Sequence, residues 1–249
     1  MYLKTKGLVL RVTNYHDTDA LLTILTQSHG LLTIKARNLR RKNSRLVAPC
    51  QLLAYSEFTL FSYKDFYTIN EANTIELFQG LRKDIQKLAL GSYIAQLSEV
   101  LSQEDIPNPE LLSLALNSLF ALSNLNANET QIKATFELRC ACLAGYTPDL
   151  FQCVSCGSQS ADRFNVSSGH LECNSCGNYE SDGIRVPIMP GVLDAMRYIC
   201  SCDPKHIFSY TLGVDALNQL SETTELYLIT QLERGFSTLD FYKSLLFMS

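Results

Sequence analysis

The stretch "ALLTILTQSHGLLTIKAR", residues 20–37, decides how the first part of this chain folds. Its two halves are rich in Leu, Ile and Thr, and the segment QSHG between them has the length of a hairpin loop and ends in Gly30. Similar runs stand at 6–13, 52–61 and 66–75, with no helical period among them. Five short strands predict a small closed barrel of the oligonucleotide-binding (OB) type, because closure leaves no sheet edge exposed.

From residue 81 the apolar residues change to a helical period. Ile85, Leu88, Tyr93, Leu97 and Leu101 recur every three to five positions, which is typical of an amphipathic helix. Helical patterns also occupy 106–125, 129–146, 188–200, 226–235 and 238–247. We therefore expect an α+β multidomain protein: an OB-fold β-barrel at 1–80, an α-helical domain in two parts at 81–148 and 184–249, and a cysteine-rich insertion at 149–183.

The insertion carries four of the nine cysteines as two Cys-x-x-Cys-Gly knuckles, formed by Cys153, Cys156, Cys173 and Cys176. Two thiolates can converge on one metal ion from such a tight turn, and Gly157 and Gly177 allow the left-handed backbone that ends it. The spacing therefore predicts a structural Zn²⁺ site, in which four thiolates leave no open position for catalysis. Disulfides and an iron–sulfur cluster are the alternatives.

Other candidate ligands are less suitable. His170 lies close to Cys173, but four thiolates already complete a zinc shell, so we expect no ligation by this histidine. The pairs Cys140/Cys142 and Cys200/Cys202 are spaced i, i+2, which on a helix points the two side chains to different faces. We interpret Cys50, Cys140 and Cys142 as small buried hydrophobic residues.

The segment around the knuckles is acidic. Arg163 and Arg185 are its two cations, against five acids: Asp149, Asp162, Glu172, Glu180 and Asp182. Because nucleic-acid affinity depends on positive charge, this composition favours a structural ribbon over a nucleic-acid-reading finger.

Positive charge is concentrated instead near the N-terminus. The 249-residue chain has a net charge of −4, but residues 1–80 carry +4 and residues 81–249 carry −8. Six cations and no acid lie within 35–45: Lys35, Arg37, Arg40, Arg41, Lys42 and Arg45. This stretch, the basic loop, connects the third and fourth predicted strands, where it can lie over the barrel's binding face. A solvated surface loop is the alternative.

Aromatic residues follow the basic loop on the next predicted hairpin. They are Tyr55, Phe58, Phe61, Tyr63, Phe66 and Tyr67. Strand alternation sends some of them into the core, so we expect only one or two to offer a surface on which bases stack.

Signatures of catalysis are missing from the sequence. It has no phosphate-cradling glycine loop, no nucleophile elbow and no HExxH helix. Asp17 and Asp19 resemble a carboxylate pair, but acids in a short connection between strands are more often turn formers. The first residues alternate polar and apolar side chains, and no long uncharged apolar run follows. We expect a cytoplasmic protein with no membrane partner.

Several motifs together resemble the bacterial recombination mediator family RecO over essentially the whole chain. They are "GLVLR" at 7–11, "YHDTDALLTILTQSHG" at 15–30, "KARNLRRKNSRL" at 35–46, "FELRCACLAGYTPDL" at 136–150 and the two knuckles. The family usually has glycine where this chain has Asn38, and asparagine also tolerates left-handed backbone geometry.

The resemblance implies a non-enzymatic, nucleoid-associated protein of recombinational repair. Such a protein binds single- and double-stranded DNA, anneals complementary strands and acts with RecR to load RecA on DNA coated by single-strand-binding protein (SSB). By position, the six basic-loop residues become the DNA contacts and the four knuckle cysteines the zinc ligands. Arg139 becomes a candidate partner for the C-terminal tail of SSB, with an ordinary surface cation as the alternative.

Two other functions stay open at this stage. One is a zinc-ribbon adaptor between proteins, in which the basic loop binds an acidic partner and makes no contact with DNA. The other is an enzyme whose active site has no recognisable motif.

Overall fold

The computed structural model describes residues 2–64, 66–125, 127–176 and 183–247. Their contacts divide the chain into two compact units, one of residues 1–126 and 236–249 and one of residues 127–235. Each is described by itself, and the predicted domain boundaries at residues 80, 148 and 183 stay a prediction. Within the described ranges, no helix combines the length and the apolar character that crossing a bilayer requires.

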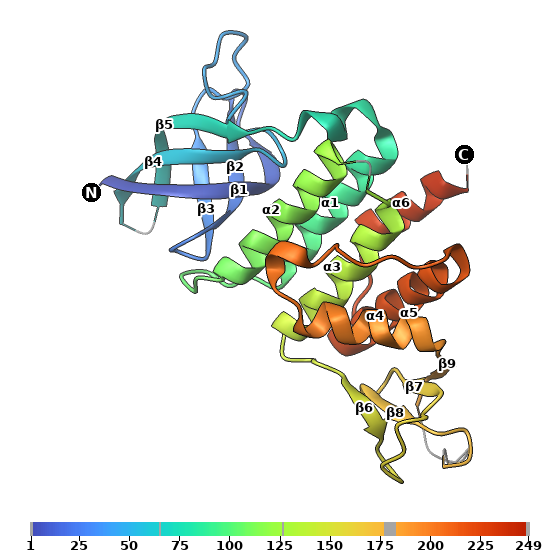
Figure 1. The fold of residues 1–249 in the computed structure, drawn as a ribbon. Helices are drawn as coiled ribbons and strands as arrows, with labels where there is room; N and C mark the ends of the chain where they lie inside the picture. The colour runs from blue at the N-terminus through green and yellow to red at the C-terminus, as the bar shows by residue number, and fades with distance from the viewer. Residues whose placement is uncertain (1, 65, 126, 177–182, 248–249) are drawn as a thin grey trace. The chain divides into compact units, whose positions relative to one another are not determined.

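The first unit contains a closed five-stranded barrel, as the sequence predicts (Figure 1). Its strands follow the order β1-β2-β3-β5-β4, and the parallel pair between β3 and β5 closes the ring. All other pairs are antiparallel. The strands are β1 (Tyr2–Tyr15), β2 (Asp19–Thr26), β3 (Leu31–Ala36), β4 (Tyr55–Tyr63) and β5 (Phe66–Glu76).

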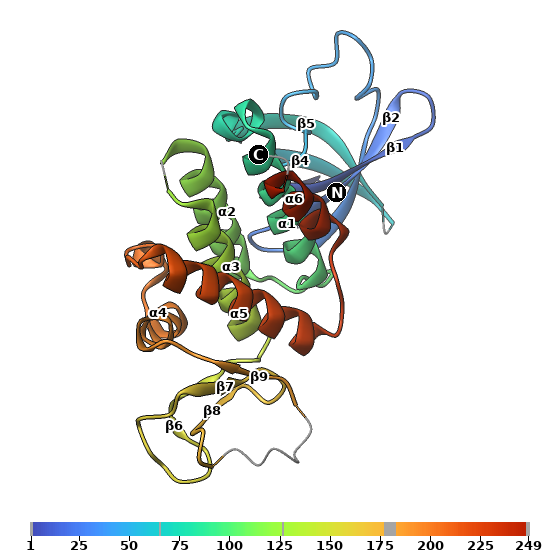
Figure 2. The same cartoon turned by 90° about the vertical axis from the view of Figure 1, so that its right-hand side faces the viewer.

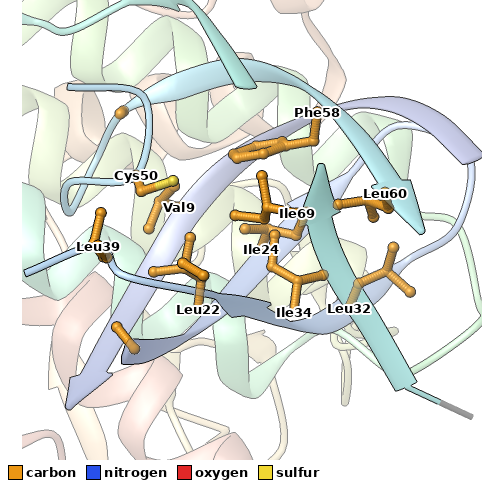
Figure 3. Close-up of a cluster of buried hydrophobic side chains, with 13 residues drawn as sticks. Val9, Leu22, Ile24, Leu32, Ile34, Leu39, Cys50, Phe58, Leu60 and Ile69 are labelled. Carbon is orange, nitrogen blue, oxygen red and sulfur yellow. The ribbon is translucent and has the colours of Figure 1, made fainter. Parts of the chain in front are cut away.

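Alternating apolar residues fill the barrel. Leu22 and Ile24 of β2, Ile34 of β3 and Phe58 of β4 are fully buried. The segment between β3 and β4 contributes Leu39 and Cys50 at the same end of this cluster (Figure 3). The interpretation of Cys50 as a buried hydrophobic residue is therefore confirmed.

A required glycine fixes the hairpin between β2 and β3. Gly30 has a φ of +61°, and a Cβ there would lie 2.4 Å from the carbonyl oxygen of Ile106. Only glycine combines this backbone conformation with so close an approach.

Four helical segments complete the first unit. Side chains that the sequence places before two of them cap their N-termini: Asp84 accepts hydrogen bonds from the backbone of Gln86 and Lys87, and Asn108 accepts one from Leu111. The segments are the 3₁₀ turn η1 (Gln79–Lys83) and the helices α1 (Ile85–Val100), α2 (Pro109–Asn124) and α6 (Ser237–Leu246).

The second unit is built on α3 (Glu129–Leu143), α4 (Pro190–Ser201) and α5 (Val214–Leu232), with a short 3₁₀ turn η2 (Pro204–His206). Helix α5 begins well before the predicted stretch 226–235. The buried side of the helix includes Thr223 and Thr224 at its middle. Their polar hydroxyl groups interrupt the apolar period from which the sequence prediction was made.

A four-stranded sheet stands between α3 and α4 in the chain, and we call it the ribbon (Figure 2). Its order is β6-β8-β7-β9, with β6 (Asp149–Cys153), β7 (Arg163–Asn165), β8 (His170–Glu172) and β9 (Arg185–Pro187). Phe164 and Leu171 are fully buried in it. The strands are short, so this sheet buries few apolar side chains of its own.

Candidate nucleic-acid interface and metal centre

The basic loop is attached to the barrel at its start. Asp19 of β2 accepts a hydrogen bond from the backbone N–H of Asn38 at 2.8 Å and pairs with the Lys35 ammonium at 3.0 Å. The Asn38 N–H and then Lys35 lower the pKa of Asp19. Asn38 adopts a φ of +55°, the left-handed geometry that its position predicts. Asp19 therefore holds the loop in place, which agrees with its interpretation as a turn former.

The interior of the loop is also ordered. The backbone N–H of Arg40 donates to the carbonyl of Thr18 at 3.0 Å, and that of Ser44 donates to the carbonyl of Arg41 at 3.0 Å. Leu39 is buried in the barrel core while its neighbours point outward. One apolar anchor thus fixes the backbone and leaves the charged side chains on the surface.

The six cations of the loop are not equivalent. Lys35 is half-buried, pairs with Asp19 and lies 4.9 Å from the centre of the Tyr15 ring. The other five are exposed, and no ion pair within the described ranges includes any of them: Arg37, Arg40, Arg41, Lys42 and Arg45. Their charge is available to an external anion.

Aromatic residues form a pocket of about 420 Å³ on the barrel surface. It is lined from all five strands, and the side chains lining it include Lys35 and Arg37 of the basic loop together with Tyr15, Phe61, Tyr63, Phe66 and Tyr67. Phe66 is 76% exposed and Tyr63 is 65% exposed, whereas Phe58 points into the core. The pocket therefore combines exposed rings with positive charge. Tyr15, which lies on β1, also joins this group, although no sequence pattern connects it with the other rings.

The four knuckle cysteines meet in the ribbon. Their sulfur atoms all lie within 4.8 Å of one another, and those of Cys156 and Cys173 are 3.8 Å apart. Sulfurs at about 2.3 Å from a tetrahedral ion are separated by roughly 3.8 Å, so the set fits a metal ion. The backbone N–H of Cys173 donates to the sulfur of Cys153 at 3.3 Å, which favours the thiolate form.

The turn of the first knuckle has the predicted geometry. Gly157 has a φ of +71°, and its N–H donates to the carbonyl of Cys153 at 2.9 Å. Gly177 of the second knuckle lies outside the described residues. Four cysteines from two such turns can therefore hold a metal ion in a closed shell.

His170 is directed to a carboxylate and not to the sulfur cluster. Its Nε2 lies 3.1 Å from Glu172, which also accepts hydrogen bonds from Asn165 at 2.8 Å and Arg185 at 2.7 Å. Burial raises the pKa of Glu172, but these three donors together lower it below its ordinary value. The expectation that His170 is not a ligand agrees with this arrangement.

The acidic surface predicted for the ribbon needs a correction. Glu172 is buried and paired with Arg185, so it adds nothing to the surface charge. Asp149 and Asp162 are exposed, while Glu180 and Asp182 lie outside the described residues. Glu172 and Arg185 are 13 residues apart in the sequence, so their pairing leaves no local sign.

Arg139 has a structural role within the second unit. Its Nη1 donates to the carbonyl oxygens of Ile199 at 3.0 Å and Cys200 at 2.7 Å. These are carbonyls of the last turn of α4, where a cation is favourable. Arg139 therefore ties α3 to the end of α4, and its contact with an SSB tail stays a prediction.

The interpretation of Cys142 as a buried hydrophobic residue is wrong, although that of Cys140 is confirmed. Cys142 is only partly buried, and its sulfur lies 3.6 Å from that of Cys200. The i, i+2 spacing correctly separates the two cysteines of each pair, but the fold brings together one cysteine from each.

Comparison with known proteins matches both units. The family description "Recombination protein O N terminal" fits residues 1–78, and "Recombination protein O C terminal" fits residues 82–240. The chain belongs to the RecO family. This is a family of DNA repair and recombination proteins.

Individual relatives agree with this assignment over nearly their full length. The DNA repair protein RecO of Acetivibrio thermocellus is 35% identical over 247 residues, which cover 98% of this chain and 97% of the relative. The protein of the same name from Alkaliphilus metalliredigens is 30% identical over 98% of this chain and 100% of the relative. That of Bacillus subtilis is 29% identical over 91% of this chain and 88% of the relative.

Proposed function

We propose that this chain is a non-enzymatic recombination mediator that binds single- and double-stranded DNA and anneals complementary strands. With RecR it helps to load RecA onto DNA coated by SSB. Annealing brings two polyanions together and therefore requires charge neutralisation and strand positioning, which a cationic surface supplies without a chemical step.

One observation carries this proposal: the basic loop and the aromatic pocket form a continuous surface. Lys35 and Arg37 belong to both. Arginine pairs with phosphate groups, and exposed rings stack on unpaired bases. A surface with both features fits a single strand better than an acidic protein segment, which offers carboxylates but no base for the rings.

The metal ion is Zn²⁺ and its role is structural. Zinc prefers four cysteine thiolates in tetrahedral geometry, and the closed shell leaves no position for a substrate. The ion would be held by Cys153, Cys156, Cys173 and Cys176. When bound, it cross-links β6 to the turn that follows β8 and so stabilises a sheet with a small core.

The protein partners of this role are RecR, the SSB tail and, indirectly, RecA. Arg139 is the candidate contact for the carboxylates of the SSB tail. Its Nη1 is used by α4, so such a contact would use the remaining N–H groups of the guanidinium.

Reversing three charges of the basic loop tests the DNA interface. With about four to five phosphates engaged, log K for single-stranded DNA should fall against log salt with a slope of roughly −3 to −3.5. The triple change Arg40→Glu, Arg41→Glu and Lys42→Glu removes three contacts, so the slope should become less steep by roughly 2 and the affinity should fall at least about tenfold. Fluorescence anisotropy at several salt concentrations measures both quantities, and an annealing assay should show a parallel loss.

The matched control reverses three exposed lysines outside the barrel, by Lys83→Glu, Lys205→Glu and Lys243→Glu. It changes the net charge equally but should leave the slope nearly unchanged. Equal losses in the two variants would mean that only overall charge matters. A wild-type slope near zero, with binding to an acidic peptide, would favour the protein adaptor.

The exposed rings of the aromatic pocket predict a second contribution to the affinity for single-stranded DNA, one that does not depend on salt. Phe66→Ala removes the most exposed ring of the pocket and should weaken single-strand binding by roughly 1–3 kcal/mol, about 5- to 150-fold, with an unchanged salt slope. Duplex DNA, whose bases are stacked already, should lose much less. Phe241→Ala, which removes a 53% exposed ring from α6, is the control and should bind as the wild type does. Equal losses on both DNA forms would contradict stacking in this pocket.

A further inference from the structure

Two cysteines outside the metal centre form a close pair in the second unit. Cys142 lies near the end of α3 and Cys200 near the end of α4, and their sulfur atoms are 3.6 Å apart. Both side chains are partly accessible to solvent, and Gly145 and Thr147 nearby in the chain are exposed. A small oxidant in solution can therefore reach the pair.

The Arg139 side chain holds the two helix ends together beside this pair. Arg139, one helical turn before Cys142 on α3, donates hydrogen bonds to the carbonyl oxygens of Ile199 and Cys200. The two helix ends are thus fixed to each other at the position where the sulfurs meet. Closing the sulfur–sulfur distance from 3.6 Å to a covalent length of about 2.05 Å requires a small movement of two side chains.

The two thiols are chemically different. The interaction of the Cys142 sulfur with the Cys200 sulfur outweighs burial and, with the Thr147 hydroxyl and the positive charge of Arg139, lowers the pKa of Cys142 to about 7. The same interaction, burial and the Cys142 charge raise the pKa of Cys200. Cys142 is therefore the more acidic of the two and the readier source of the thiolate, which is the reactive form of a cysteine.

Three other titratable groups interact with this pair, and none of them reverses the order of the two cysteine pKa values. Cys202 lies two residues beyond Cys200, and burial raises its pKa, so it stays protonated. Tyr227 of α5 is also close, and burial followed by the charges of the two cysteines raises its pKa. Arg139 is the nearest cation acting on all three cysteines.

We propose that Cys142 and Cys200 form a peroxide-sensitive dithiol that closes reversibly to a disulfide. The Cys142 thiolate attacks hydrogen peroxide, forming an S–O bond and breaking the O–O bond, so that Cys142 becomes a sulfenic acid and hydroxide leaves. Cys200 then attacks the Cys142 sulfur, the S–S bond forms, the S–O bond breaks and water leaves with the Cys200 proton. Together the two sulfurs lose two electrons, and one peroxide is reduced to one hydroxide and one water; the hydroxide then takes a proton from the solvent.

The position of this bond in the chain gives it a structural consequence. Cys142 and Cys200 are 58 residues apart, and all four knuckle cysteines lie between them. The disulfide would therefore close the base of the ribbon, joining the chain where it leaves α3 to the chain where it ends α4. Because cross-linking reduces the freedom of the unfolded chain, the oxidised protein should unfold at a higher temperature than the reduced protein.

Peptide mapping of the full-length, metal-loaded protein tests this proposal. The protein is treated with hydrogen peroxide, its remaining thiols are alkylated at low pH, and non-reducing digests are analysed by mass spectrometry. We expect one linked peptide pair that joins Cys142 to Cys200 and disappears after treatment with dithiothreitol. Zinc release measured in the same samples reports any oxidation of the ribbon cysteines.

Three variants show which cysteine reacts with peroxide and which one closes the disulfide. Cys200→Ser should accumulate a sulfenic acid at Cys142 that dimedone traps, whereas Cys142→Ser should give neither the link nor a trapped product at Cys200. Cys202→Ser is the matched control and should form the link as the wild type does. The proposal is overturned if both cysteines stay fully alkylatable while the ribbon cysteines are oxidised, if the link joins Cys202 instead, or if Cys200 is the trapped residue.

Discussion

Replacing Cys153 and Cys156 together with serine is expected to unfold the ribbon and to abolish metal binding. The first knuckle supplies half of the ligands, and two thiolates cannot hold a structural zinc ion. The three strands β7, β8 and β9 span three residues each, so the sheet has little apolar core with which to replace the metal. Metal binding of this kind is coupled to folding.

The extent of this unfolding follows from the contacts of the ribbon. Gln231 of α5 donates to the carbonyl of Val166 at 2.9 Å, and the Tyr227 ring lies 5.3 Å from that of Phe164. Helix α3, in contrast, has its own buried residues, among them Phe136. We therefore expect the loss of folded structure to be complete in the ribbon, partial along α5 and smallest in α3. It should not be uniform over the C-terminal half.

Metal analysis and hydrogen exchange measure this result. The wild type should carry one zinc ion per chain and the variant none, and amides of β6–β9 should lose at least about a hundredfold in protection. Cys202→Ser removes a cysteine outside the cluster and should keep its zinc. A double variant that keeps its ribbon protection, or that stays folded but loses DNA binding, would show that the ribbon is not a structural element.

Lys133→Met should destabilise the second unit by about 3–5 kcal/mol, because it leaves two carboxylates beside each other without the cation between them. The Lys133 side chain is 5% exposed, and its ammonium lies 3.0 Å from Glu137 on α3 and 2.7 Å from Glu225 on α5. Thr224 also donates to Glu137 at 3.1 Å. Burial lowers the pKa of Lys133, but the charges of Glu137 and Glu225 outweigh it and raise the pKa above its ordinary value. The lysine therefore stays charged and links the two helices.

Urea unfolding at neutral pH measures the cost of Lys133→Met. A surface ion pair in the same chain provides the control: Lys4 lies 2.9 Å from Glu57 with its side chain 65% exposed, and Lys4→Met should cost less than about 1 kcal/mol.

The stability of Lys133→Met should depend on pH with a definite sign. In Lys133→Met the repulsion raises the carboxylate pKa values above those of the unfolded chain, so the folded state binds protons more strongly. Stability lost at neutral pH should then be partly regained as the pH falls toward these raised pKa values. Equal losses of stability in Lys133→Met and Lys4→Met would contradict a stabilising buried ion pair at Lys133. So would a Lys133→Met variant that regains no stability on acidification.

Local patterns predicted much of this fold. The alternation of apolar residues placed the five strands, because each residue's face in a strand depends on its immediate neighbours. The caps Asp84 and Asn108 also act locally, because each accepts hydrogen bonds from the first turn of the helix that follows it. The four cysteines of the candidate metal centre were found for the same reason, since Cys-x-x-Cys encodes a turn that brings two sulfurs together regardless of the rest of the fold.

Errors arose where a residue's environment comes from a distant part of the chain. The start of α5 was missed because Thr223 and Thr224 are buried against other elements of the second unit, which no local period reveals. Glu172 was counted as a surface acid because its partner Arg185 is on another strand.

The sequence by itself determined the barrel, most of the helical segments, the basic loop and the four cysteines that can hold a metal ion. Tertiary structure alone decided that aromatic rings from three strands form one pocket with Lys35 and Arg37, that Lys133 joins α3 to α5, and that Cys142 meets Cys200. The physical reason is the range of the interactions. Backbone geometry acts over a few residues and leaves a periodic trace in the sequence, whereas these contacts depend on the path of the whole chain and leave none.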